Sequence, residues 1–158
     1  MQNKIEIREA TQADLPDIVE LWKSIMDFHR NLDSFFSRSQ DGHRNYLDWV
    51  IKEMESDNSE LFIAESKGKL LGYIKIQTSD YPPVFEKKKY GMISDAIVNE
   101  KYRRKGIGEA LFHRAMGWFK EKEIERVELR VANVNPVARG FWKKMGFRPY
   151  MTTMFKEE

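Results

Sequence analysis

The sequence predicts an α+β protein, with a central mixed, mostly antiparallel sheet of about six or seven strands flanked by about four helices. Three observations support this class. Apolar residues recur at helical spacing in some segments and alternate with polar residues in others. The chain has 158 residues, the length of one domain. Hydrophobic residues make up 41% of it, enough to form a core. We therefore expect one domain over residues 1–158.

The first part of the chain predicts one strand and two helices. Residues 5–8 alternate between apolar and charged, which is typical of a half-buried strand. Residues 14–29 keep an apolar face at helical spacing. Pro16 is compatible with this helix because it lies in the first turn, where a missing N–H is tolerated. A polar connection then leads to a second helix ending near Met54.

The rest of the chain alternates between strands and helices. Residues 61–66 and 70–79, joined by a turn at residues 67–69, predict a β-hairpin, and after a proline-containing loop residues 90–98 predict the next strand. A glycine-containing turn then opens a helix over residues 109–120. Further strands are expected at residues 126–133 and 147–155. Between them Asn135-Pro136 has the form that opens a helix.

Composition excludes several classes of function. The net charge of +2 is too small for a general nucleic-acid-binding surface. There is no cysteine, and the three histidines lie far apart, so we expect no disulfide and no metal site. No stretch resembles a signal peptide or a membrane span, so we expect a cytoplasmic protein that does not bind a membrane.

The segment YRRKGIG, residues 102–108, places three adjacent cations before a glycine-containing turn and a helix. The first backbone N–H groups of a helix have no partner within it, and its dipole favours an anion there. The segment therefore predicts a phosphate-binding turn. The alternative is a solvated basic turn. The segment lacks the Walker pattern and the third glycine of GxGxxG, which argues against a nucleotide-binding protein.

A second motif follows about thirty residues later: Asn135-x-x-Ala138-x-x-Phe141-Trp142-x-x-x-Gly146-Phe147. In this order, with the β-α-α-β-β-β-α-β-α-β succession, the two motifs resemble those of the GNAT superfamily of acyl-CoA-dependent N-acyltransferases. The resemblance covers nearly the whole chain. It implies an N-acetyltransferase that uses acetyl-CoA and transfers acetyl by direct attack in a ternary complex. A non-catalytic acyl-CoA-binding or sensing module is the alternative.

The resemblance also implies cofactor-binding residues. The pyrophosphate of coenzyme A is expected on the turn, and the pantetheine arm on the backbone of Ile97 and Val98, between that strand and the next. Asn135 and Ala138 match the helix motif that closes over the arm, although Asn135 also has a purely structural reading as a helix N-cap. The implied residues of the turn are Arg103, Arg104, Lys105, Gly106, Ile107 and Gly108.

Asp95, in the strand MISDAIV, lies where many family members carry an acidic residue, so the resemblance implies that it is the catalytic base. An acid in an apolar strand also needs either a function or a partner. A structural carboxylate bonded to nearby backbone is the alternative. Many family members carry a tyrosine, which can protonate the leaving thiolate, where this chain has Trp142. Water, the proton of the attacking ammonium or Tyr150 could serve instead.

The acceptor is expected to be a primary amine of a small molecule or peptide. Its pocket is expected in the second half of the first helix, in the connection over residues 31–42 and in the proline-containing loop over residues 79–89. Each aromatic residue there also has a reading as core. The candidate residues are Phe28, His29, Phe35, Phe36 and Tyr81. The resemblance further allows a homodimer that pairs through the C-terminal strands.

Overall fold

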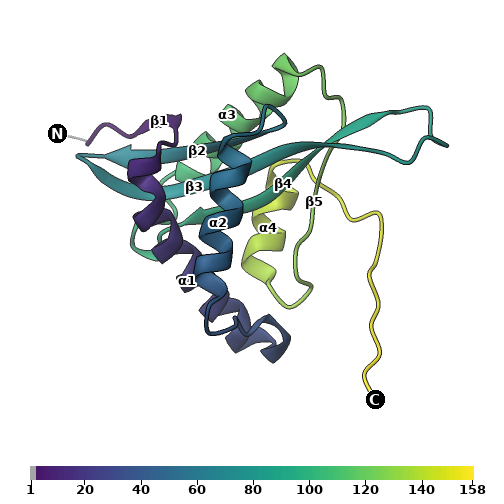
Figure 1. Cartoon of the computed structure of the whole chain (residues 1–158), viewed down its shortest axis with the longest axis horizontal. Coiled ribbons are helices and arrows are strands. Elements are labelled where there is room, and N and C mark those ends of the chain that lie inside the picture. Colours follow the sequence, from purple (N-terminus) through teal and green to yellow (C-terminus); the bar gives the residue numbers. More distant parts are fainter. Residues whose placement is uncertain (1–2) are drawn as a thin grey trace.

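The computed structural model describes residues 3–158, and it confirms the predicted α+β class (Figure 1). Within these residues five strands form one sheet, in the order of the chain. The first three neighbouring pairs are antiparallel, and β5 runs parallel to β4. The strands are β1 (Glu6–Glu9), β2 (Ser59–Ser66), β3 (Lys69–Asp80), β4 (Lys89–Val98) and β5 (Val127–Leu129).

The helices cover both faces of this sheet. Helices α1 (Leu15–Leu32) and α2 (Gly42–Met54) lie together across one face, as Figure 1 shows, and Pro16 stands in the first turn of α1 as predicted. Helix α3 (Ile107–Glu121) packs on the opposite face. Helix α4 (Pro136–Lys144) packs beside α3 through aromatic side chains. The sheet therefore separates two apolar cores.

Strand β4 changes face in its middle. Asp95 lies opposite Lys75 of β3, but Ile93 lies opposite Ile76, so Ser94 is an extra residue in β4 and forms a β-bulge. In such a bulge two successive side chains point to the same side of the sheet. Accordingly Ile93 packs in the core under α3, whereas Ile97, four residues on, packs in the core under α1 and α2.

Strands β4 and β5 separate at the same place. Their parallel ladder joins residues 91–93 of β4 to residues 127–129 of β5 and then ends. The second half of β4, from Ser94 to Val98, has no ladder partner on that side among the described residues. This opening confirms a splay between the two strands, and it begins at the bulge.

Two predictions about the end of the sheet are wrong. The strand expected at residues 126–133 is limited to Val127–Leu129. Residues 147–155, expected as a closing strand, form no strand, and the sheet therefore has fewer than six strands in the described chain. The pattern of this segment is strand-like, but a strand also needs an edge with which to pair, and the tail runs away from the sheet (Figure 1).

Candidate functional site

The turn after β4 has the backbone conformation of an anion-binding turn. Arg104 and Gly106 both have positive φ, 63° and 78°, and Gly106 is the residue before the first turn of α3. Positive φ is unfavourable for arginine but not for glycine. Such left-handed residues orient successive N–H groups into one concave surface. The strain at Arg104 is therefore consistent with a functional turn.

The amides of this turn are free to bind a ligand. None of the backbone N–H groups of residues 104–108 donates to an acceptor within residues 3–158. A Cβ atom added to Gly106 would point into open space. Arg103, Arg104 and Lys105 are exposed around these amides, whereas the side chain of Ile107 is buried. The residues present thus fit a phosphate group of coenzyme A.

Three elements meet beside the turn. A Cβ atom on Gly108 would lie 3.4 Å from the Phe141 ring of α4 and 3.6 Å from the Val98 side chain of β4. The Arg103 Nε also donates to the Val98 carbonyl oxygen at 3.1 Å. The end of β4, the start of α3 and α4 are therefore adjacent, as the resemblance requires.

The edge of β4 at the splay carries unpaired backbone groups. The Asn99 N–H donates to the Leu71 oxygen of the preceding strand at 2.8 Å. Backbone groups alternate in direction along an antiparallel strand, so those of Ile97 also face β3, whereas those of Ala96 and Val98 face the splay. The structure places Val98 and Ala96, rather than Ile97, where their N–H and C=O groups can meet a ligand.

Asp95 is held by a chain of buried hydroxyl groups. Its Oδ2 accepts a hydrogen bond of 2.8 Å from the Tyr46 hydroxyl of α2, which lies 2.8 Å from the Tyr73 hydroxyl of β3. Tyr46 in turn stacks on Trp22 of α1, with ring centroids 4.4 Å apart. No hydrogen bond joins Oδ1 to another described residue. One carboxylate oxygen is anchored and the other is available.

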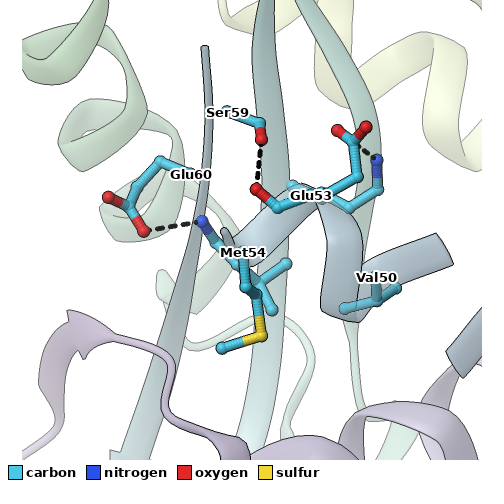
Figure 2. Close-up of a pocket in the computed structure, with 7 residues that line it drawn as sticks. Val50, Glu53, Met54, Ser59 and Glu60 are labelled. Carbon is cyan, nitrogen blue, oxygen red and sulfur yellow. Dashed lines mark hydrogen bonds and ion pairs between the residues drawn. The ribbon is translucent and has the colours of Figure 1, made fainter. Parts of the chain in front are cut away.

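Lys75 lies opposite Asp95 in the β3–β4 ladder, and its positive charge favours the ionised carboxylate. Its side chain is 1% exposed, and its Nζ lies 3.6 Å from the centroid of the Trp49 ring, 3.2 Å from the Ser94 hydroxyl and 3.7 Å from Glu53. Figure 2 shows Glu53 on the last turn of α2, with this ion pair as a dashed line. The crevice drawn there, between α2 and strands β2 and β3, is too narrow for water and is no acceptor pocket.

Burial dominates the electrostatics of this cluster. It raises the pKa of Asp95 above its usual value, and the Tyr46 hydrogen bond and the Lys75 charge oppose this rise. Burial also lowers the pKa of Lys75, against the charges of Asp95 and Glu53. The pKa values of both tyrosines are raised by burial, so their hydroxyls stay protonated and can donate. The site is thus suited to a carboxylate that takes up a proton.

His29 connects the predicted acceptor region with α4. Its Nε2 lies 3.5 Å from the Asn135 Nδ2, and burial lowers the pKa of His29, which favours a neutral ring that can accept. The Asn135 Oδ1 accepts from the Ala138 N–H at 3.1 Å, so the N-cap reading of Asn135 is also present. Phe28 and Phe36 contact the His29 ring, and Phe35, which is 77% exposed, contacts Phe36.

Tyr81 lies apart from these residues. It stacks on Tyr90 beside the β3–β4 hairpin loop, and its hydroxyl donates to Glu128 of β5 at 3.0 Å. Tyr150 also donates to Glu128, at 2.9 Å. The structure therefore groups Phe28, His29 and Phe35 at the end of α1 and places Tyr81 with the β5 edge.

Trp142 occupies an aromatic cluster. Its ring lies 4.8 Å from Phe141, 6.2 Å from Phe112 and 5.5 Å from Phe147, measured between centroids. These edge-to-face contacts are typical of packing. Trp142 therefore joins α4 to α3 in the apolar core on that face.

Sequence reasoning missed Tyr46, Tyr73 and Lys75. All three look like ordinary polar or amphipathic members of their helix or strand, and only the fold brings them to Asp95. No three acidic or histidine side chains in the described part of the chain are arranged to hold a metal ion. Across residues 3–158, no helix has the length and apolar character needed to cross a bilayer.

Comparison with known proteins agrees with this geometry. A family model described as the acetyltransferase (GNAT) family matches residues 18–147. An uncharacterized N-acetyltransferase of Archaeoglobus fulgidus is 30% identical over 91% of this chain and 93% of its own. An N-alpha-acetyltransferase of Sulfurisphaera tokodaii is 32% identical over 63% of each chain. The crystal structure of a point mutant of the BH1408 protein from Bacillus halodurans, 25% identical, superposes with a TM-score of 0.89 over 97% of this chain and 99% of that one.

Proposed function

Because the chain belongs to the GNAT acetyltransferase family, we propose that it transfers acetyl from acetyl-CoA to a primary amine of a small molecule or peptide, by direct attack in a ternary complex. One observation carries this proposal. The β-bulge at Ser94 turns Asp95 toward Tyr46 at the point where β4 leaves β5 and its edge becomes free. A base and a row of backbone donors thus lie on one strand segment. We propose that residues 1–158 act as one N-acetyltransferase domain.

Acetyl-CoA is the co-substrate. We assign its pyrophosphate to the free amides of residues 104–108, with Arg103, Arg104 and Lys105 neutralising its charge. The pantetheine arm then pairs with the splay edge of β4, much as an added strand would. Asn135 and Ala138, at the start of α4, lie on the other side of the arm.

The attacking amine must first lose a proton, because an alkyl ammonium has a pKa of about 10. Asp95 takes this proton on the oxygen that Tyr46 leaves available. Its raised pKa makes it a stronger base than an exposed aspartate. The amine nitrogen then bonds to the carbonyl carbon, and the carbon–sulfur bond breaks.

The reaction also needs donors for the carbonyl oxygen and a proton for the departing thiolate, and neither requires an acidic side chain. The N–H groups of Ala96 and Val98 at the splay can donate to the carbonyl oxygen as it gains negative charge. The thiolate that departs is a weak base, since a thiol has a pKa of about 8.5, so water or the proton released by the amine is sufficient. The Tyr150 hydroxyl is occupied by Glu128.

Replacing Trp142 with tyrosine should therefore preserve turnover. Trp142 packs in an aromatic cluster, so the smaller ring should lower the free energy of unfolding by about 1–2 kcal/mol. Acetyl-transfer rate and thermal unfolding of the variant check both parts. A complete loss of activity with normal unfolding would assign Trp142 a role in the reaction.

Lys75 stabilises the ionised form of Asp95, so removal of Lys75 should raise the pKa of that carboxyl. Lys75 is the cation that favours the ionised form of Asp95, so Lys75→Met leaves only the Tyr46 hydrogen bond to oppose burial. NMR titration of the carboxyl carbon, assigned with Asp95→Asn, measures the pKa directly. The acid limb of kcat/KM should move to higher pH by the same amount.

Two variants serve as controls for Lys75. Lys75→Arg keeps the positive charge and should restore most of the wild-type pKa. Lys89→Met removes an exposed lysine from the neighbouring strand, where its partner is Asp80, and should leave Asp95 unchanged. An equal Asp95 pKa in wild type and Lys75→Met would show that Lys75 acts only in packing.

The function is tested by thiol release from acetyl-CoA in the presence of amine panels. The panels are peptides with a free N-terminus, chosen because one relative is an N-alpha-acetyltransferase, and small amines such as polyamines and amino sugars. We expect release that depends on the acceptor and a product heavier by one acetyl group. Binding of acetyl-CoA without release from any panel would favour a non-catalytic binding module.

We also propose that the chain forms a homodimer, because its last strand-like segment has no strand partner within residues 3–158.

A further inference from the structure

Glu128 of β5 lies on the same face of the sheet as Asp95. In the parallel ladder Glu128 pairs with Met92 of β4, and paired residues point to the same face. The next pair, Leu129 and Ile93, packs in the core under α3. Because side chains alternate along a strand, Glu128 points to the opposite face. That is the face on which Asp95 contacts α2.

Three donors hold one oxygen of the Glu128 carboxylate. The hydroxyls of Tyr81 and Tyr150 donate to Oε1 at 3.0 and 2.9 Å, and the Arg126 Nε donates to the same atom at 3.0 Å. No hydrogen bond from residues 3–158 reaches Oε2, and this atom is not buried. The side chain as a whole is only 14% exposed. Glu128 therefore has a fixed orientation and one oxygen that is open to a ligand.

The surroundings favour the charged form of Glu128. Burial acts to raise its pKa, but the hydrogen bonds from Arg126, Tyr150 and Tyr81 outweigh burial and lower the pKa below its usual value. Arg126 is the one cation within 4.0 Å of this carboxylate in the described part of the chain, and it uses Oε1. Its guanidinium also stacks on the Tyr150 ring, 4.6 Å from the ring centre. Oε2 is thus left for a second cation, as a charge-assisted acceptor.

Glu128 is also placed beside the splay. The ladder between β4 and β5 ends at the pair of Ile93 and Leu129, and Asp95 follows on the part of β4 without a ladder partner on that side. Met92, at the level of Glu128, is three residues before Asp95, which corresponds to roughly 10 Å along an extended strand. A flexible ligand of a few carbon atoms can therefore meet Asp95 with one end and Glu128 with the other.

We propose that Glu128 determines acceptor specificity: its Oε2 binds a second cationic group of the acceptor while the reacting amine lies at Asp95. This inference rests on the proposed function and names its substrate class, a small flexible diamine. The distal ammonium donates to Oε2, and the amine at the other end loses its proton to Asp95. A monoamine of the same length uses only the second of these contacts and should be the poorer acceptor.

Cadaverine and pentylamine test this inference, because they differ only in the second amino group. We expect cadaverine to have a kcat/KM higher by about 10-fold or more, since a hydrogen bond between charged groups is lost with pentylamine. Glu128→Gln keeps the shape and can still accept from both tyrosines. It should raise KM for cadaverine about 10-fold, change kcat little and leave pentylamine unaffected. Glu125→Gln, which removes an exposed carboxylate paired with Lys87, should change neither amine.

Equilibrium binding tests the same contact without the reaction. Calorimetric titration of cadaverine into the protein saturated with CoA should show tighter binding to the wild type than to Glu128→Gln, with equal melting temperatures. Glu128→Asp keeps the charge and should retain part of the preference. Equal binding of both amines by the wild type, or equal binding of cadaverine by wild type and Glu128→Gln, would overturn the inference. Selective binding of cadaverine without turnover of either amine would support it and contradict only the proposed acetyl transfer.

Discussion

Replacing Asp95 with asparagine should lower kcat/KM for acetyl transfer by about 100-fold to 10,000-fold, the range expected for loss of a general base. Asparagine has nearly the same shape and can still accept the Tyr46 hydrogen bond, so the bulge and the two cores should persist. Acetyl-CoA binding should be retained, because the turn at residues 104–108 is untouched. Acceptor-dependent thiol release and a binding titration measure the two effects separately.

The same variant should be more stable than the wild type, and the gain should depend on pH. Burial raises the pKa of Asp95 in the folded protein above the ordinary value of 3.8. A group with a raised folded pKa favours folding in its protonated form, and that contribution is lost as the pH rises through the folded pKa. Below the ordinary value both states are protonated and the substitution should change little. Above the folded pKa the wild type carries a buried charge that asparagine lacks, so the melting temperature of the variant should be the higher one there.

Two controls make this result specific. Asp48→Asn, on the exposed side of α2, should change neither activity nor the pH dependence of stability. Tyr46→Phe removes the hydroxyl that holds Asp95 and should raise its pKa further without removing the base. Full activity in Asp95→Asn would show that Asp95 is a structural carboxylate, the alternative left open by the sequence.

Local patterns predicted most of the fold. The four helices and the strands up to residue 98 lie where the apolar periods of 3.6 and 2 residues predict them. The spacing of apolar residues that predicts each element is contained in that element's own segment. The final strand was wrong for a different reason. Residues 147–155 have the composition of a strand, but a strand forms only by backbone pairing with an edge, and the contact of this segment with β5 is between side chains, Tyr150 and Glu128. Whether a strand-like segment pairs depends on the position of distant strands, which the local pattern does not contain.

The site was predicted only in the parts that lie on one segment. The basic turn and Asp95 stand out because cations before glycines, and an acid in an apolar strand, are unusual locally. Tyr46, Tyr73 and Lys75 come from three places in the chain, and the bulge at Ser94 decides that Asp95 faces them. A single extra residue in a ladder depends on the register of the partner strand, which sequence periodicity does not contain.

Gly108→Trp should abolish the binding of acetyl-CoA. Bound at about 100 times its Kd, a ligand stabilises the folded state by about 2.7 kcal/mol, which raises the melting temperature by a few degrees in a domain of this size. A Cβ atom at Gly108 already contacts Phe141 and Val98 at 3.4 and 3.6 Å, so an indole there should crowd the space between the turn, β4 and α4. The shift with acetyl-CoA should disappear from the variant.

The matched control makes the same substitution on the same helix. Gly117→Trp lies where an added Cβ meets nothing within 4 Å, so it should keep the full acetyl-CoA shift. ATP should not reproduce the shift in the wild type, because phosphate alone does not use the splay edge of β4. A wild-type shift that survives in Gly108→Trp would place coenzyme A elsewhere on the protein. Equal loss in both variants would point to damage of α3, because only a change at the start of that helix should remove the anion site.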